Sequence, residues 1–526
     1  MKKVMRMGLW VGFGVALAVA VPVGAADETG FDVFEYAVRG NTTLPAISIE
    51  AAVYPHLGEK KTIADVEAAR AALEKAYHSA GYLTVLVDIP EQKVASGVVT
   101  LRVTEGSVAR LRVVGSRYFS LGEIKATTLE LAEGTVPHFP TMQKELTALN
   151  TSVDRRVTPV LRPAKTPGQV EVDLKVEDQF PLHGELTLDN RASAKTSATR
   201  LSGNVMYTNL WQKQHSLGIG FQVAPQNPEE ARVLSMTYLQ PALGGTLALF
   251  GVVSRSNVGV AGDTRVLGNA NIAGARWIKP LRSWRGANQL LSLGVDYKDF
   301  SDDLLFGADR FTTPISYMPF SLEYRGSAGD DVVKTQWNLG LTVSLRGLAD
   351  ETIECIPGFV TNEFDCKRFG AKANFAYLRG GLRHERSIGE DYAVAAHMEF
   401  QLANQPLISN EQFSAGGAQT VRGYTESAAL GDRGVVAGLE ALGPKWGDVE
   451  RYTLRPLAFV EGATLKVIEA TTLQRDVFNL GSVGLGLRLS SRFGLTSDLD
   501  AAWPLTALGE SEKGELRLHW RLGYKW

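Results

Sequence analysis

The C-terminal two-thirds of the chain, from about residue 182 to residue 526, consists of segments of about 8–12 residues in which apolar side chains alternate with polar or small ones. A period of two is typical of a β-strand whose two faces meet different surroundings. The final segment, residues 514–526, shows it most clearly. One face carries Leu516, Leu518, Trp520, Leu522, Tyr524 and Trp526, and the other carries Arg517, His519, Arg521 and Lys525. The pattern predicts sixteen antiparallel strands.

A soluble sandwich and a membrane barrel both alternate in this way, and the N-terminus helps to choose between them. An apolar run of about 14 residues, 8–21, follows Lys2, Lys3 and Arg6 and precedes a set of small residues. This order is typical of a secretory signal peptide over residues 1–26, with cleavage after Ala25 or Ala26. The run is short of the ~20 residues that a spanning helix needs. An exported chain with no other long apolar run favours an outer-membrane barrel, with one strand face in lipid and the other in a wet lumen.

The composition agrees with a strand-rich exported protein. The 53 glycines exceed the usual share of about 7% and favour many turns and strands over a helical bundle. Mean hydropathy stays near zero because only half of each strand is apolar. The net charge of −2 offers no basic face for nucleic acid.

The two cysteines, Cys355 and Cys366, lie in a turn-rich stretch between two alternating segments. A cysteine pair in an exported protein indicates a local disulfide that closes a loop. The alternative, a two-ligand metal site, lacks a neighbouring histidine. We therefore expect a disulfide and no bound metal.

Residues 27–181 contain two copies of one small α/β module, residues 27–108 and 109–181, each in the order β-α-α-β-β. In the first copy, Thr62 can cap a helix that Gly81 ends. The apolar stripe of this helix consists of Val66, Ala69, Leu73, Ala76 and Tyr77.

The module order and three short motifs resemble POTRA domains, the polypeptide-transport-associated modules of outer-membrane protein transporters. The motifs are Val38-Arg39-Gly40-Asn41, Gly81-Tyr82 and Glu105-Gly106-Ser107-Val108. The sequence of the first copy is similar to that of the haemolysin secretion/activation proteins of two-partner secretion. The resemblance implies that the modules bind client chains by adding a strand to a sheet edge. The alternative is a pair of structural spacers.

A glycine-rich loop at about residues 404–434 carries Phe413, Gly416, Gly417 and then Val421-Arg422-Gly423-Tyr424. This resembles the inward-folding loop of the outer-membrane assembly and secretion superfamily, whose arginine pairs with an acid on the barrel wall. The wall motif, usually F-x-D-x-G, is here Phe459-Val460-Glu461-Gly462, with glutamate for aspartate and the glycine one position early. We expect Arg422 to pair with Glu461, since a guanidinium can bind a carboxylate through two hydrogen bonds.

Two further features resemble the same superfamily. The terminal aromatic, Trp526, ends an amphipathic strand of the kind that the barrel assembly machinery recognises for insertion. Asp189-Asn190 resemble the start of the first barrel loop, and we assign them no chemistry. Secretion relatives often begin with a helix that plugs the pore, whereas here the first module begins within a few residues of Asp27. We expect the pore to be gated by the Arg422 loop alone.

The resemblance implies a translocator that exports an unfolded exoprotein. The sequence gives no oligomeric state, and a monomer is the default expectation. The alternative is an assembly factor for other outer-membrane proteins, whose relatives carry more POTRA copies. A passive porin or adhesin is a third class and would not need the modules or the loop. We expect no enzyme activity and no cofactor, because the sequence lacks a GxxxxGK phosphate loop, a GxSxG elbow and an HExxH helix.

Overall fold

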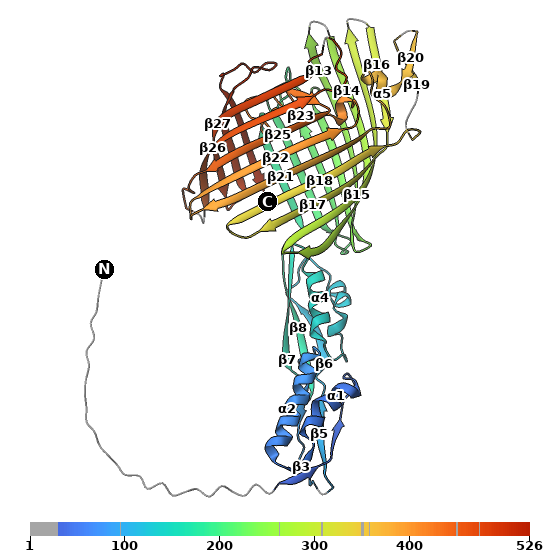
Figure 1. Cartoon of the computed structure of the whole chain (residues 1–526), viewed down its shortest axis with the longest axis vertical. Helices are drawn as coiled ribbons and strands as arrows, with labels where there is room; N and C mark the ends of the chain where they lie inside the picture. Colours follow the sequence, from blue (N-terminus) through green and yellow to red (C-terminus); the bar gives the residue numbers. More distant parts are fainter. Residues whose placement is uncertain are drawn as a thin grey trace, which may run out of the picture. The chain divides into compact units, whose positions relative to one another are not determined.

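The computed structural model describes residues 30–94, 96–261, 264–306, 309–348, 352–356, 358–448, 451–472 and 474–526 (Figure 1). The predicted signal peptide lies outside these residues. The chain divides into two compact units, Met1–Arg117 with Leu121–Asp178, and Tyr118–Ser120 with Gln179–Trp526. Among the described residues, no helix is long and apolar enough to cross a membrane.

The first half of the first unit has the predicted β-α-α-β-β order. Its elements are β1 (Phe31–Val33), β2 (Glu35–Arg39), α1 (Ala46–Val53), η1 (Tyr54–His56), β3 (Gly58–Lys61), α2 (Ile63–Ser79), β4 (Leu86–Asp88) and β5 (Val98–Thr104). The sheet order is β2-β5-β4, with β2 and β5 parallel. The antiparallel pairing of β1 with β3 was not predicted, because β3 has only four residues, Gly58–Lys61, and they show little alternation of apolar and polar side chains.

Helix α2 closes the core of this module as its apolar stripe predicts. Val66, Ala69, Leu73 and Tyr77 are buried against the sheet, and Ala76 packs at the margin. At the start of the helix, the Asp65 carboxylate accepts the Thr62 backbone N–H at 2.8 Å, which satisfies one donor that the first turn leaves open.

The second half of the first unit repeats the order, also as predicted. Its elements are β6 (Ser107–Val114), α3 (Leu121–Thr127), η2 (Leu129–Leu131), α4 (Phe139–Leu149), β7 (Arg155–Pro163) and β8 (Gln169–Asp178), in the sheet order β6-β8-β7. The two modules meet at Gly81, whose carbonyl accepts the Phe139 N–H at 3.0 Å. A Cβ at Gly81 would lie 2.8 Å from the His138 ring, so the Gly81-Tyr82 step is a contact between modules as well as a helix stop.

Glu105 ties the end of β5 to the turn after β2. Its carboxylate accepts the backbone N–H groups of Thr42 at 2.8 Å and Thr43 at 3.0 Å, together with both threonine hydroxyls. Partial burial raises the pKa of Glu105, but these hydrogen bonds outweigh it, so the net pKa lies below its ordinary value of 4.5.

Glu105→Ala is expected to destabilise this module by about 1.5–3 kcal/mol, the usual contribution of hydrogen bonds to a charged group. Since the folded pKa is depressed, this stabilisation is present above about pH 4.5 and is lost as the pH falls through the folded value. Amide hydrogen exchange at Thr42 and Thr43 in the full-length protein measures it. Exchange that is equally slow in Glu105→Ala and wild type would contradict the role of this carboxylate.

The second unit is a closed antiparallel barrel (Figure 1). Its strands are β9 (Leu182–Asp189), β10 (Arg200–Leu210), β11 (His215–Val223), β12 (Arg232–Ala242), β13 (Gly245–Ala261), β14 (Thr264–Trp284), β15 (Ala287–Phe306), β16 (Asp309–Tyr317), β17 (Pro319–Gly329), β18 (Val333–Ser344), β21 (Ala376–Ile388), β22 (Tyr392–Ala403), β25 (Arg433–Leu442), β26 (Tyr452–Lys466), β27 (Val477–Ser491), β28 (Leu495–Pro504) and β29 (Arg517–Lys525).

The barrel has sixteen strand positions, as predicted, because β16 and β17 occupy one position. Both pair with β15, β16 through Lys298↔Tyr317 and β17 through Val295↔Phe320, and the register continues unchanged across Met318. The chain enters β9 and leaves β29 at the same end of the barrel. We call this the turn end, because its connections are as short as residues 243–244; the opposite, loop end includes residues 345–375 and 404–432.

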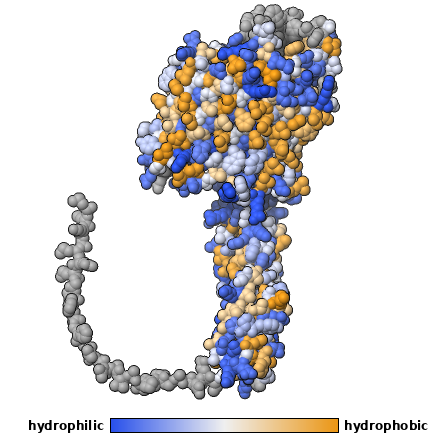
Figure 2. Space-filling model, in the orientation of Figure 1, coloured by the Kyte–Doolittle hydropathy of each residue, from blue (hydrophilic) through white to orange (hydrophobic). Residues whose placement is uncertain are grey.

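The alternation in the sequence separates the outside of the barrel from its lumen. Exposed apolar side chains such as Val205, Ile219, Leu234 and Leu522 point outward, and Figure 2 shows apolar side chains across the outer face. The face of β29 that carries His519 and Arg521 points to the lumen. One strand face in lipid and the other in a polar interior is the arrangement that the pattern predicts.

The barrel closes where β29 pairs with β9, between Arg521↔Asp189 and Lys525↔Glu185. Trp526 extends the closure, since its backbone N–H donates to the Gly184 carbonyl at 3.0 Å and its carbonyl accepts the Gly184 N–H at 3.2 Å. The Trp526 ring lies over Gly184, where a Cβ would approach the ring to 2.0 Å. Glycine is required there because the ring occupies the space of a side chain.

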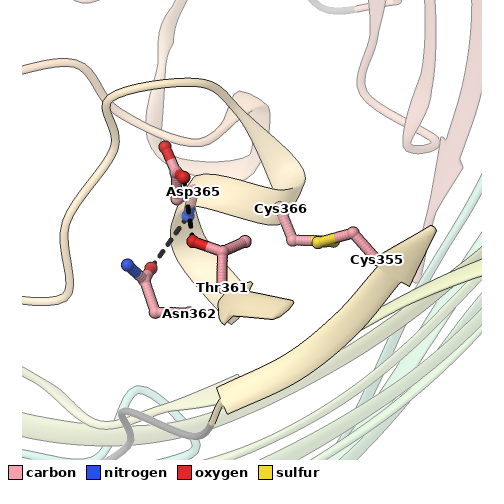
Figure 3. Close-up of a disulfide and its surroundings, with 5 residues drawn as sticks. All are labelled: Cys355, Thr361, Asn362, Asp365 and Cys366. Carbon is pink, nitrogen blue, oxygen red and sulfur yellow. Dashed lines mark hydrogen bonds between the residues drawn. A yellow bond between two sulfur atoms is a disulfide. The ribbon is translucent and has the colours of Figure 1, made fainter. Parts of the chain in front are cut away.

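The connection between β18 and β21 is folded rather than open. It contains β19 (Thr352–Ile356), β20 (Phe359–Asn362) and α5 (Glu363–Lys367), and a disulfide joins Cys355 to Cys366 (Figure 3). Asn362 caps α5 by accepting the Asp365 N–H at 2.9 Å. Phe364 packs against Tyr317 of β16, so this disulfide-closed loop lies against the barrel wall.

Candidate functional site

Residues 404–432 connect β22 to β25 and fold into the barrel; we call them the inward segment. It contains η3 (Ser409–Glu411) and a short hairpin of β23 (Phe413–Ala415) and β24 (Ala429–Gly431). Val421 and Tyr424 have no exposed surface and Arg422 is 3% exposed, so the predicted motif lies at the buried tip. The segment ends two residues before the predicted limit of residue 434, where β25 begins.

Glycines allow the tight path of this segment. Gly416 and Gly417 both have φ +107°, and a Cβ at Gly417 would lie 2.3 Å from the Glu426 carboxylate. At the tip, Gly423 has φ +94° and a Cβ there would meet Pro504 at 3.2 Å. A side chain at these positions would be both strained and crowded, which explains why the motif is rich in glycine.

Arg422 and Glu461 form the predicted pair. Glu461 accepts the Arg422 backbone N–H at 2.8 Å through one oxygen and the Nε–H at 2.9 Å through the other, which also accepts from the Nη2 group. The carboxylate therefore fixes both the backbone and the side chain of the tip. Phe459, two residues earlier on the same strand face, lies beneath the guanidinium, with 3.4 Å from its central carbon to the ring centroid. This contact adds a cation–π interaction.

Two more carboxylates at the site were not predicted. Arg422 also donates to Glu440 at 2.8 Å and to Asp500 at 3.3 Å, and Asp500 pairs with Arg488 at 2.8 Å. Alternation in the sequence places each of these residues on the lumenal face of β25, β27 or β28. The alternation does not show which strands lie next to one another at the tip. Their arrangement is seen only in the closed barrel. The arrangement is a buried charge cluster of two arginines and three carboxylates.

Gly462, assigned by sequence to the wall motif, is not part of the cluster. It follows Glu461 on β26 and so lies on the opposite, outward face, paired with Ala437 and Gly481. Its place one position before the family pattern explains the difference, since a shift of one residue on a strand changes the face.

Tyr424 anchors the other side of the tip. Its hydroxyl can donate its one proton to the Thr506 carbonyl at 2.8 Å, and it also lies 3.0 Å from the Gly481 carbonyl. Its ring packs in a cluster with Val421 and Leu480. Val421 and Tyr424 thus fasten the tip by apolar contact while Arg422 fastens it by charge.

His519 of β29 accepts the Gly423 N–H at its Nε2 atom over 2.8 Å. Only a neutral imidazole with its proton on Nδ1 can accept there. A protonated ring would place an N–H against the Gly423 N–H, close to the charge of Arg422.

In planar bilayers, acidification from about pH 7 to about pH 4 is therefore expected to increase channel opening as His519 gains a proton. His519→Gln keeps an acceptor oxygen but cannot be protonated, so its channel should open less as the pH falls. Asp500, the register partner of His519 on the neighbouring strand β28, is the same in both proteins, so a difference between them is due to residue 519. Identical pH profiles of the two proteins would contradict the role of His519.

The base of the inward segment has two further charged anchors. Asp432, which is fully buried, accepts the Leu407 N–H at 2.9 Å and the Ile468 N–H at 2.6 Å and pairs with Arg368 through both oxygens. Glu411 pairs with Lys298 at 2.5 Å and accepts the hydroxyls of Tyr317 and Tyr377. Sequence motifs did not single out either residue, because an isolated acid in a loop carries no spacing signal.

Asn190 also contributes to the barrel, although the sequence assigned it no chemistry. Its side chain donates to the Leu518 carbonyl at 2.8 Å and accepts the Trp520 N–H at 2.9 Å, which continues the pairing of β9 with β29 beyond Asp189. The Ala192 carbonyl just after it accepts the Glu426 N–H at 3.2 Å. The first barrel loop therefore contacts the inward segment.

Within the described residues, no three His, Cys, Asp or Glu side chains are placed to hold a metal ion. The acids of the charge cluster face arginines.

Comparisons with known proteins agree with this geometry. The family model for the haemolysin secretion/activation proteins ShlB/FhaC/HecB matches residues 168–440, more than half of the 526 residues. The chain belongs to this family. A ShlB-type POTRA domain model matches residues 31–106, and an Omp85 superfamily domain model matches residues 360–526.

Two curated relatives of this haemolysin secretion/activation chain are outer membrane transporters CdiB. The one from Escherichia coli is 24% identical over 183 residues, 34% of this chain and 30% of the relative. The one from Dickeya dadantii is 24% identical over 135 residues, 26% of this chain and 24% of the relative. The chain thus aligns with less than a third of the length of each.

Solved structures share the fold. CdiB from Escherichia coli has a TM-score of 0.61 at 18% identity, over 97% of this chain and 93% of that structure. BamA from Haemophilus ducreyi lacking POTRA domains 1–3 has a TM-score of 0.57 at 13% identity, over 94% of this chain and 100% of that structure. The family, the POTRA modules and the sixteen-stranded barrel place this member in the outer membrane with its modules in the periplasm.

Proposed function

We propose that the protein is the transporter of a two-partner secretion pair, which captures an unfolded exoprotein with its periplasmic modules and exports it through the barrel. The inward segment carries this proposal. A loop whose tip is fixed by one guanidinium and three carboxylates blocks a pore yet rests on contacts that can be exchanged, unlike a covalent plug. A passive porin has no use for such a device.

Capture would take place at the open edges of the two module sheets. Among the described residues, the outer strands are β2 and β4 in the sheet order β2-β5-β4, and β6 and β7 in the sheet order β6-β8-β7. Val87 of β4, Val108 of β6 and Val157 of β7 already form hydrogen bonds to other parts of the modules through their backbone groups, so these three edges are open only in part. Unpaired backbone groups at such edges can bind an extended client strand. The periplasm lacks ATP, so folding of the client outside the cell would supply the drive.

The second candidate is an assembly factor that inserts other outer-membrane proteins, favoured by the fold that the barrel shares with BamA. The match to the haemolysin secretion/activation family favours secretion. In either role the protein works as a monomer, has no catalytic residue and no cofactor, and depends on the barrel assembly machinery for its own insertion, with Trp526 in the recognised strand.

Proteomics of the cell surface and medium, with and without this protein, separates the candidates. Loss of one large exported protein, with other barrel proteins at normal levels, is the result expected for secretion. A joint fall of many barrel proteins would instead establish the assembly role. Normal levels of every exported and barrel protein would contradict both.

A further inference from the structure

The lumenal face at the centre of three neighbouring strands, β10, β11 and β12, carries no charged side chain. Its central residues are Asn204, Met206, Gly218, Gly220, Ser235 and Thr237, which we call the neutral wall. Each alternates with an outward apolar neighbour such as Val205, Ile219 or Met236, so all six point inward. None carries a charge, and all except Met206 are small or hydroxyl- or amide-bearing.

A cavity of about 360 Å3 lies against the neutral wall. The tip of the inward segment forms its hydrogen bonds with other strands, to Glu461 of β26, the Gly481 carbonyl of β27 and His519 of β29. The tip therefore lies against the last strands, and none of these contacts is to the neutral wall.

A second cavity, of about 870 Å3, has the opposite character. Arg325, Arg383, Glu399, Glu440 and Arg488 line it together with Arg422. A third cavity, of about 250 Å3, borders the neutral wall at Asn204 and contains Glu185 and Arg521 of the neighbouring strands β9 and β29. Among these three cavities, the one against the neutral wall is the one without a charged side chain.

We infer that the exported chain passes through the barrel in extended form along the neutral wall. This rests on the proposed function. An exported chain presents acidic and basic side chains in succession, and fixed charges lining the pore would hold one sign and repel the other. Passage requires contacts that are weak and interchangeable. Hydroxyl and amide groups provide these, and Gly218 and Gly220 let a backbone approach closely.

A bulky side chain on the wall tests the inference. Ser235→Trp is expected to lower the surface level of the exported protein at least tenfold, and Gln336→Trp, which fills the charged cavity from β18, is expected to change it less than twofold. Heat-modifiable migration on gels checks that both barrels fold. Equal export by Ser235→Trp and wild type, or an equal defect in Gln336→Trp, would overturn the inference.

A cysteine variant allows a bulky group to be attached after the barrel has folded, so the test does not require the barrel to fold with a tryptophan at this position. The described cysteines are joined in the disulfide, so Ser235→Cys adds one free thiol that a maleimide carrying a bulky polyethylene glycol chain can modify after insertion. Modification should stop export in Ser235→Cys and leave it unchanged in Gln336→Cys; continued export after complete modification overturns the inference. If the wild type itself exports no single protein, the proposed function fails instead.

Discussion

Arg422→Ala is expected to convert a mostly closed channel into one that is mostly open in planar bilayers. The substitution leaves Glu440, Glu461 and Asp500 buried with Arg488 as the one remaining cation of the cluster. Removing one partner of a buried ion pair costs about 3–5 kcal/mol, because the other charge loses its compensation. That cost would fall on the inward position of the loop and shift its equilibrium outward by roughly a hundredfold or more.

Arg383→Ala is the matched control for this experiment. Arg383 faces the same cavity and pairs with Glu440 at 3.3 Å, but its side chain is 47% exposed. A pair of this kind contributes about 0–1 kcal/mol, so the variant removes the same lumenal charge without freeing the tip. Equal conductance in the two variants would mean that the loss of a lumenal charge, and not release of the inward segment, sets the current. A wild-type channel that is already large and steadily open would rule out gating by this loop.

Asp432→Ala is expected to loosen the base of the inward segment and the disulfide-closed loop together. It leaves Arg368 without its partner and the N–H groups of Leu407 and Ile468 without an acceptor, again at a cost of about 3–5 kcal/mol. Trypsin added to intact cells should then cleave at Arg368 at least tenfold faster than in the wild type. The barrel should also lose its heat-modifiable form at a lower temperature.

Asp498→Ala controls for the loss of an acid from the lumenal face. Its ion pairs with Arg488 at 3.6 Å and Arg521 at 3.9 Å are long and partly exposed, so little change is expected. Asp432→Asn, which keeps the shape and one acceptor oxygen, should fall between wild type and Asp432→Ala. If trypsin cleaves wild type and Asp432→Ala equally, this carboxylate does not hold the two loops together.

Most of the fold was predictable from the sequence because alternation along a strand directly reports its two surroundings. The strand count, the outward face of β29 and the two β-α-α-β-β modules all follow from it. The pair of Arg422 with Glu461 followed from two short motifs that resemble a known superfamily. These features are local, so each was available within one stretch of chain.

The rest of the site depends on which strands become neighbours. Glu440 and Asp500 lie 18 and 78 residues from Arg422 in sequence, and no spacing rule joins them. Asp432 and Arg368 belong to different loops that meet only when the barrel curves. Gly462 belongs to the wall motif only by its place in the sequence, and its strand position one residue after Glu461 puts it on the outward face.

The meeting of β9 with β29 constrains how such a barrel can be made. Asn190 and Trp520 are 330 residues apart, and their hydrogen bond exists only when the last strand has arrived. Until then the growing sheet has two open edges, each able to pair with a foreign strand. Such long-range pairing is slow because the loss of chain entropy precedes any gain. The seam between β9 and β29 is therefore where backbone groups stay unpaired longest, and the backbone pair of Trp526 with Gly184 extends this seam.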